Sequence, residues 1–344
     1  MDVLEFLRPH IKSLKAYSSA RDEFSEISTD LTFIDANENP FQTNVNRYPD
    51  PLQNKLKTEW SKYMGIPINQ IMFGNGSDEV LDLIFRAFCN PEQDNVVILP
   101  PTYGMYEVLA QLNNIEVKKA ELDKNFQPDI ASILKLVNEN TKLLFICSPN
   151  NPSANDLKED LIKDLIKSFK GIIIIDEAYI DFSSQQSFVS YIEKYPNVIV
   201  TQTFSKAFGL AGIRLGICYA TPPIINVFNK IKPPYNVNEL TQKKALERIQ
   251  NIDVVKKEVQ TIIEQRQFLI KELKTINCVD KVFASDANFI LARVDNANLR
   301  YKQLIDNGIV VRNRTTQPLC ENCLRFTVGT KSENLKLISI LKSF

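Results

Sequence analysis

Short apolar segments alternate with helical patterns through the middle of this chain. Strands are expected at 71–73, 96–99, 117–122, 143–147, 172–175, 197–201 and 215–220, with helices at 52–64, 80–89, 103–112, 130–137 and 157–168. Apolar strands separated by helices form mostly parallel sheets whose two faces are both covered. The pattern therefore predicts an α/β fold with a large domain, in which a mostly parallel central sheet is covered by helices on both faces.

The flanking segments predict the remaining domain organisation. Residues 1–44 are expected to form an N-terminal arm and part of a small domain, with a short strand at 32–35, and residues 45–235 the large, ligand-binding domain. After Pro233 and Pro234 the sequence pattern changes and predicts long helices over 238–275, with a break near Asn251. Strands at 288–294, 310–312 and 324–328 then predict a smaller α+β domain over residues 236–344.

Composition excludes several classes of partner. Lysine and arginine total 41 and aspartate and glutamate 41, so no nucleic-acid or membrane partner is expected. No apolar run approaches the roughly 20 residues that cross a bilayer, and residues 1–24 carry too many charges for a signal peptide. The six cysteines are spread along the chain, which favours a reduced, cytoplasmic location. Cys320 and Cys323 form an isolated CxxC pair, so no metal is expected.

The segment 203–216 follows an expected strand and carries the main chemical signal. Lys206 leaves that strand beside Ser205 and eight residues before Arg214. A lysine amine bonds covalently to carbonyl cofactors once burial or a nearby cation lowers its pKa. The serine hydroxyl and the arginine are groups that suit a phosphate monoester. Taken alone, such a segment is more often a surface loop that happens to contain a lysine.

Other polar groups follow neighbouring strands at the edge where ligands of parallel sheets bind. Asp176 ends the expected strand 172–175 and could pair with a pyridinium nitrogen, or simply cap the next turn. Tyr179, three residues later, could donate to a ring hydroxyl oxygen. Asn151 could donate to the same oxygen or belong to an ordinary Asn-Pro turn. Tyr103 follows another strand and suits stacking on a flat ring.

The segment 74–79 lies between a strand and a helix and reads GNGSDE. Free backbone N–H groups near Ser77 and Asp78, together with the helix dipole, would form an anion site. The chain has only ten glycines, and five of them fall at 74, 76, 209, 212 and 216. This clustering indicates that these two segments need unusual backbone angles or close approach to a ligand.

Together, these segments resemble the pyridoxal-phosphate-dependent aminotransferases of the aspartate aminotransferase fold type I, class II subfamily. Within them, the histidinol-phosphate aminotransferase family is the most similar. The resemblance rests on 17–21 (YSSAR), 36–40 (ANENP), 47–50 (RYPD), 74–79 (GNGSDE), 148–152 (SPNNP), 176–179 (DEAY), 204–214 (FSKAFGLAGIR) and 324–330 (LRFTVGT). These blocks extend over nearly the whole chain.

The resemblance implies a pyridoxal 5'-phosphate enzyme and a role for each matching residue. Lys206 would hold the cofactor covalently and move a proton between the substrate Cα and the cofactor C4′, with Asp176 and Tyr179 as its catalytic partners. The remaining cofactor-binding residues would be Asn151, Tyr103, Ser205, Arg214, Ser77, Asp78 and, from the neighbouring subunit of a homodimer, Tyr48. Arg325 would bind the glutamate carboxylate. Tyr17 and Arg312 would contact a substrate phosphate, with Asn37 nearby.

The reaction implied is transamination between L-histidinol phosphate and 2-oxoglutarate, giving imidazole-acetol phosphate and L-glutamate in histidine biosynthesis. An aromatic amino-acid aminotransferase and a threonine-phosphate decarboxylase share the same fold and stay open as alternatives. A transcription regulator that uses such a domain as a ligand sensor would need a DNA-binding module. The roughly 30 residues before the core are too few and not basic enough for one.

One position departs from the family pattern. The glycine that usually follows the Asn-Pro-Ser/Thr sequence is Ala154 here. An alanine with positive φ would be strained by about 1 kcal/mol or more, so a slightly different path of this loop is expected, with Asn151 kept in place. His10, the only histidine, lies outside every motif and receives no catalytic role.

Overall fold

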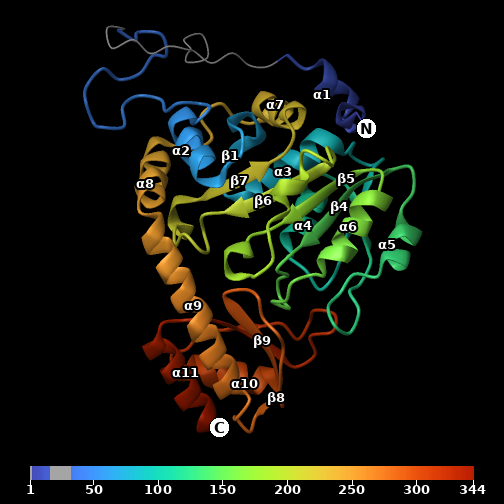
Figure 1. The fold of residues 1–344 in the computed structure, drawn as a ribbon, viewed down its shortest axis with the longest axis vertical. Helices are drawn as coiled ribbons and strands as arrows, with labels where there is room; N and C mark the ends of the chain where they lie inside the picture. Colours follow the sequence, from blue (N-terminus) through green and yellow to red (C-terminus); the bar gives the residue numbers. More distant parts are fainter. Residues whose placement is uncertain (1, 16–31) are drawn as a thin grey trace.

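The computed structural model describes residues 2–15 and 32–344. Figure 1 shows a large sheet with helices on its two faces, a smaller sheet with its own helices, and the long helix α9 (Ile252–Leu273) running between the two parts. The predicted α/β fold with a smaller α+β domain is confirmed. No helix in these described residues is long and apolar enough to span a membrane.

The large sheet has seven strands in the order β1-β7-β6-β5-β4-β2-β3. Their bounds are β1 Ile71–Asn75, β2 Asn95–Ile98, β3 Glu116–Lys119, β4 Thr141–Cys147, β5 Ile172–Asp176, β6 Val198–Thr203 and β7 Leu215–Tyr219. The strands β3, β2, β4, β5 and β6 are parallel, whereas β7 is antiparallel to both β6 and β1. Since β1 and β6 both oppose β7, they point the same way, and six strands present their carboxyl ends at one edge.

The four consecutive isoleucines of β5 explain why this sheet is covered on both faces. Ile173 and Ile175 belong to one apolar core, and Ile172 and Ile174 to the other, with all four fully buried. Side chains alternate between the two faces of a strand, so a continuous apolar run needs cover on both sides. The helices of this part are α1 Pro9–Ser13, α2 Asn54–Met64, α3 Ser77–Phe88, α4 Met105–Leu112, α5 Ile130–Leu136, α6 Glu159–Ser168, α7 Pro222–Ile231 and α8 Glu239–Gln250.

The smaller part is built on a four-stranded antiparallel sheet in the order β10-β11-β9-β8. Its elements are β8 Val279–Val282, β9 Phe289–Val294, α10 Ala297–Asp306, β10 Arg312–Asn313, β11 Cys323–Thr327 and α11 Lys331–Lys342. Asn251 separates α8 from α9, as the sequence indicates. The helix α8 packs on α2 of the large part, so α9 makes the connection. The domain boundaries stay a prediction.

A buried arginine fixes the small part against the large sheet. Arg266 of α9 is 6% exposed and donates from Nη1 to the carbonyl oxygens of Phe182 (3.1 Å) and Ala287 (2.9 Å). Phe182 follows β5, whereas Ala287 precedes β9. One guanidinium therefore satisfies backbone acceptors from both parts, which holds their relative position where β5 ends.

The structure differs from the sequence-based expectation at three elements. Residues 32–35 form no strand, and Ile34 is 91% exposed. The strand β8 and the helix α7 were not expected. β8 is a polar edge strand, and α7 begins at a Pro-Pro pair that also reads as a turn.

Candidate active site

One cavity lies at the carboxyl ends of the strands in the large sheet. It is lined by Ser77, Asp78, Tyr103, Cys147, Asn151, Asp176, Ala178, Tyr179, Thr203, Ser205, Lys206, Ala211 and Arg214. These residues follow or end β1, β2, β4, β5 and β6, or precede β7. The common strand direction therefore brings together nine residues that the sequence predicts to be functional, although they are far apart in the chain.

Asp176 is a buried carboxylate held by neutral groups. Asp176 is 3% exposed, and its carboxylate accepts from the Tyr106 hydroxyl at 2.6 Å and from the Thr201 hydroxyl at 3.2 Å. Burial raises the pKa of Asp176, and the two hydroxyl donors oppose this shift by stabilising the charged form. The carboxylate therefore has the capacity to accept one further, cationic partner from the cavity.

Lys206 brings an amine to the same cavity. β6 ends at Thr203, and the backbone N–H of Ser205 donates to the Thr203 hydroxyl (3.1 Å), which turns the chain into the cavity. Partial burial lowers the pKa of Lys206, and the nearby Arg325 lowers it further, while Asp176 acts in the opposite direction. An amine with a lowered pKa is neutral, and thus nucleophilic, at a lower pH than an ordinary lysine.

Tyr179 lies beside this amine, with the Lys206 Nζ 5.6 Å from the ring centroid. Burial raises the pKa of the Tyr179 phenol, and the neighbouring Cys147 thiol adds to this shift. The phenol therefore stays protonated and can act as a hydrogen-bond donor towards the cavity.

The other end of the cavity is suited to an anion. The helix α3 begins at Ser77, with Gly76 as its cap at φ 78°. Arg214 Nη2 lies 3.5 Å from the Asp78 carboxylate, which also accepts from the Tyr103 hydroxyl at 3.1 Å. A helix N-terminus beside an arginine provides N–H donors and positive charge together.

Close backbone packing underlies this anion end. Gly216 of β7 lies opposite Gly74 in the sheet register. A Cβ atom added at Gly216 would lie 2.2 Å from the Ser77 backbone nitrogen and 2.4 Å from the Gly76 carbonyl carbon. The β1–α3 turn can therefore rest on β7 only because this residue has no side chain.

The loop after β4 connects the cavity to the small part of the molecule. Arg325 of β11 donates from Nη1 to the Asn151 side-chain oxygen, and its guanidinium lies 5.1 Å from the Phe289 ring centroid. Burial lowers the pKa of Arg325 to about 10, with Arg314 adding to the shift. Ala154 has a φ of 72°, so the alanine adopts the left-handed conformation that the expected change of loop path would have avoided. A hydrogen bond from its N–H to the Asn150 oxygen, at 2.8 Å, holds it there.

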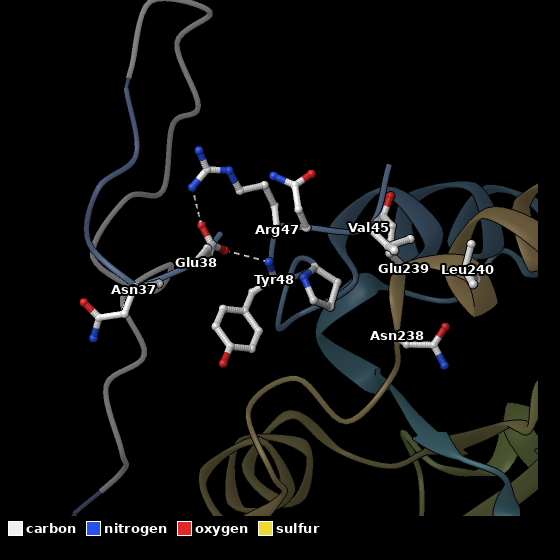
Figure 2. Close-up of a pocket in the computed structure, with 11 residues that line it drawn as sticks. Asn37, Glu38, Val45, Arg47, Tyr48, Asn238, Glu239 and Leu240 are labelled. Atoms are coloured by element: carbon white, nitrogen blue, oxygen red, sulfur yellow. Dashed lines mark hydrogen bonds and ion pairs between the residues drawn. The ribbon is translucent and has the colours of Figure 1, made fainter. Parts of the chain in front are cut away.

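Three other residues predicted from the sequence lie elsewhere, and one is outside the described residues. Tyr48 and Asn37 line a second pocket with Asn238 and Leu240 (Figure 2). Arg312 is exposed on β10, opposite Arg325 in the register. Tyr17 lies outside the described residues. In the second pocket, the Glu38 carboxylate accepts from Arg47 and from the Tyr48 backbone N–H, both at 2.7 Å; Figure 2 marks both contacts.

Sequence reasoning missed two residues that hold Asp176. Thr201 pairs with Asp176 in the β5–β6 register, and Tyr106 lies one helical turn beyond Tyr103, with its ring stacked on Phe145 at 4.9 Å. The threonine sits inside an apolar strand and the tyrosine inside an apolar helix. Only the in-register pairing of the two expected strands could have indicated Thr201.

Comparison with known proteins identifies relatives over nearly the whole chain. A family model described as aminotransferase class I and II matches residues 31–341. A histidinol-phosphate aminotransferase from Flavobacterium johnsoniae is 58% identical over 342 residues, covering 99% of this chain and 98% of that protein. Among solved structures, a histidinol-phosphate aminotransferase from Clostridium acetobutylicum aligns with a TM-score of 0.80 at 26% identity, covering 87% of this chain and 91% of that one. One from Sinorhizobium meliloti, in complex with pyridoxal-5'-phosphate, has a TM-score of 0.80 at 22% identity, covering 87% and 83%.

The close approach at Gly216 yields a stability prediction with a matched control. We expect Gly216→Ala to lower the free energy of unfolding by about 1–3 kcal/mol, because its Cβ meets backbone atoms that cannot move aside. Gly212→Ala, in the same segment, has no heavy atom within 4 Å of the added Cβ and should leave stability nearly unchanged. Urea unfolding of the two variants measures the difference, and equal stabilities would contradict the packing argument.

Proposed function

The chain belongs to the class I and II aminotransferases, and we propose that it transfers the amino group of L-histidinol phosphate to 2-oxoglutarate. The products are imidazole-acetol phosphate and L-glutamate, and the reaction belongs to histidine biosynthesis. The observation that carries the proposal is the gathering of the Lys206 amine, the buried Asp176 carboxylate and an anion-binding helix terminus in one cavity. The 58% identity to a histidinol-phosphate aminotransferase favours this substrate over those of the alternative reactions.

The residues of the cavity fit pyridoxal 5'-phosphate, the cofactor of this class of enzymes. Asp176 offers a buried carboxylate that accepts from two neutral hydroxyls at one end, and the close packing of Gly216 under the β1–α3 turn shapes a phosphate cradle at the other. When bound, the cofactor ring withdraws electrons and stabilises negative charge at the substrate Cα.

Three residues would carry the proton chemistry around that ring. Lys206 would hold the cofactor covalently, and its amine would move a proton between the substrate Cα and C4′. The lowered pKa of Lys206 favours its role as a base. Asp176 keeps the ring nitrogen protonated, and Tyr179 donates to the ring oxygen.

The remaining cofactor contacts would come from groups already in place. The side-chain oxygen of Asn151 accepts from Arg325, and the side-chain NH2 of Asn151 would donate to the ring oxygen. Tyr103 stacks on the ring. Ser205, Arg214 and the amides at Ser77 and Asp78 bind the phosphate, where the helix dipole adds to the attraction.

The substrates would be held from the small part of the molecule. Arg325 binds the carboxylate of glutamate or 2-oxoglutarate, since its planar guanidinium can donate two parallel hydrogen bonds. Arg312, opposite Arg325 in the β10–β11 register, would contact the substrate phosphate. Tyr17 and Asn37 complete the substrate-binding residues of this proposal.

The active form would be a homodimer in which Tyr48 reaches the cofactor phosphate of the neighbouring subunit. Tyr48 stacks on Tyr235 with ring centroids 4.4 Å apart, yet remains 50% exposed and lies outside the cavity of its own chain. Leu240 (64% exposed), which lines the same pocket, adds apolar surface. A second copy covering this surface would bury these side chains.

A cytoplasmic location is part of the proposal. The six cysteines are free and buried, which fits a reducing compartment, where disulfides do not form. A biosynthetic aminotransferase whose substrates are small metabolites would work there.

The substrate assignment is tested by titrating the cofactor-loaded protein with histidinol phosphate. We expect the absorbance of the lysine-bound cofactor to convert to that of its amine form, and Lys206→Ala to abolish the starting band. Phenylalanine and phosphothreonine, titrated in parallel, represent the two alternative reactions. Conversion by phenylalanine alone would refute the substrate, as would carbon dioxide release from phosphothreonine, whereas absence of any band would refute the mechanism.

Cofactor binding should depend on the protonation of Asp176, and the hydrogen bond from Tyr106 lowers the pKa of that carboxyl. Tyr106→Phe keeps the ring stacked on Phe145 but removes a donor to the charged carboxylate, so the pKa of Asp176, already raised by burial, rises further. A protonated Asp176 cannot pair with a cationic ring nitrogen. Cofactor binding is therefore lost as the pH falls through this pKa, and in the variant we expect the loss at a higher pH and a dissociation constant about tenfold larger.

The matched control for this experiment is Tyr191→Phe. The Tyr191 hydroxyl donates to Glu159, away from the cavity, so its removal should leave the acid limb of the binding curve unchanged. Identical acid limbs for Tyr106→Phe and the wild type would show that Tyr106 does not act through Asp176.

The shared active site is tested by mixing two inactive variants. Lys206→Ala lacks the amine, and Tyr48→Ala lacks the phenol offered to the partner. In a mixed dimer, one site receives both intact residues. When equal amounts of the two variants are mixed, dissociated and reassociated, about half of the dimers should contain one copy of each variant. Each mixed dimer has one complete site out of two, so the mixture should recover about a quarter of the wild-type activity. Failure to recover activity from a mixture that does form dimers would place Tyr48 in the site of its own chain.

A further inference from the structure

Three arginines lie close together on β10, the residues after it and β11 of the small sheet. Arg312 and Arg325 are directly opposite each other in the β10–β11 register. Arg314 follows β10, and its backbone N–H donates to the Cys323 oxygen at 2.8 Å. Each of the three guanidiniums is close enough to disfavour the charge on another. Within residues 2–15 and 32–344, none of them forms an ion pair with a carboxylate.

Arg314 is the member of this cluster that the sequence did not single out. Its Nε is buried and has no hydrogen-bond partner within the described part of the chain. Burial lowers the pKa of Arg314, and the charge of Arg312 adds to this, while Cys320 and the Tyr179 phenol act in the opposite direction. A partly buried guanidinium without a counter-charge is costly to keep, and an anion at this place would remove the cost.

Tyr179 connects this cluster to the cavity. Both Arg314 and Arg325 act on its phenol electrostatically, and Tyr179 lines the cavity beside Lys206. Arg325 also reaches the cavity through its bond to Asn151. An anion held by the arginines would therefore lie next to the reacting groups rather than on a remote surface.

We propose that Arg314 is a third guanidinium of the substrate-anion subsite and binds the phosphate of the phosphorylated amine and the distal carboxylate of glutamate. The inference rests on the proposed function, because the two substrates must bind in turn with their amino groups at the same place. A phosphate monoester carries about −1.5 to −2 charges near pH 7, whereas a carboxylate carries one. Three arginines can match the larger charge, and a planar fork can bind either group in a bidentate manner.

The test compares Arg314→Gln with the wild type in the cofactor-loaded enzyme. We expect the KM for histidinol phosphate to rise by about tenfold or more, and the KM for glutamate to rise less, because its distal group carries less charge. The kinetic constants for L-histidinol, which lacks the phosphate, should not change. Arg314→Lys restores the charge without the fork and should recover part of the affinity. Arg300→Gln removes an arginine that pairs with Asp295 on the small part, and serves as the charge-matched control.

A binding measurement separates this inference from the proposed function. Calorimetric titration of the cofactor-loaded protein with inorganic phosphate should show binding that is weakened about tenfold in Arg314→Gln and is unaffected in Arg300→Gln. If the wild type fails to convert histidinol phosphate but Arg314→Gln still weakens phosphate binding, the anion subsite is supported and the substrate assignment is refuted. Unchanged phosphate affinity and an unchanged KM for histidinol phosphate would overturn the inference alone.

Two further outcomes are decisive. If Arg314→Gln shifted the pH profile of the cofactor absorbance but left phosphate affinity intact, Arg314 would act on Tyr179 and not on the substrate, which would overturn the proposal. If Arg314→Gln did not fold, Arg314→Lys would carry the test. Loss of the bidentate fork should still weaken phosphate binding measurably in that variant, and wild-type affinity there would contradict the proposal.

Discussion

The candidate active site depends on the common direction of six strands in the large sheet. The residues that line the cavity follow or end different strands, and they meet because those strands end at one edge of the sheet. They include Ser77, Tyr103, Asn151, Asp176 and Lys206. The one strand of this sheet that runs in the opposite direction, β7, contributes to the site in a different way. It lies between β1 and β6 and brings a glycine under the β1–α3 turn. The shape of the anion end thus follows from the one reversal in the sheet.

Burial disfavours the charged forms of several groups in and around this cavity. Burial raises the pKa of Asp176 and lowers those of Lys206, Arg314 and Arg325. The directions are opposite but the cause is the same, since burial disfavours the charged form of each group. A cationic ring nitrogen next to Asp176 and anions next to the arginines would relieve both penalties. The site is therefore complementary to a ligand set that carries both signs of charge, as the proposed cofactor and substrates do.

The sequence predicted those features that arise from local pattern. Strands buried on both faces produce continuous apolar runs, so most strands were expected, and polar residues at their ends indicated nine lining residues of the cavity. Interactions that arise only from packing were not expected. Tyr106 reads as part of an apolar helix, and Arg314 reads as one polar residue in a loop, until the fold places them beside Asp176 and Tyr179. Residues 32–35 do not form the expected strand, and Ile34 of this segment is 91% exposed.

Ala154 shows how the two parts of the molecule are coupled. Its left-handed φ of 72° costs about 1 kcal/mol, and bonds on both sides maintain it. The Ala154 N–H donates to the Asn150 oxygen, while its carbonyl accepts from the Asp286 N–H of the small part at 2.8 Å. Arg325, also from the small part, bonds Asn151 in the same loop. If Arg325 binds a substrate anion as proposed, that anion would compete with the Asn151 contact. Substrate binding would then affect the residue that is proposed to hold the cofactor ring.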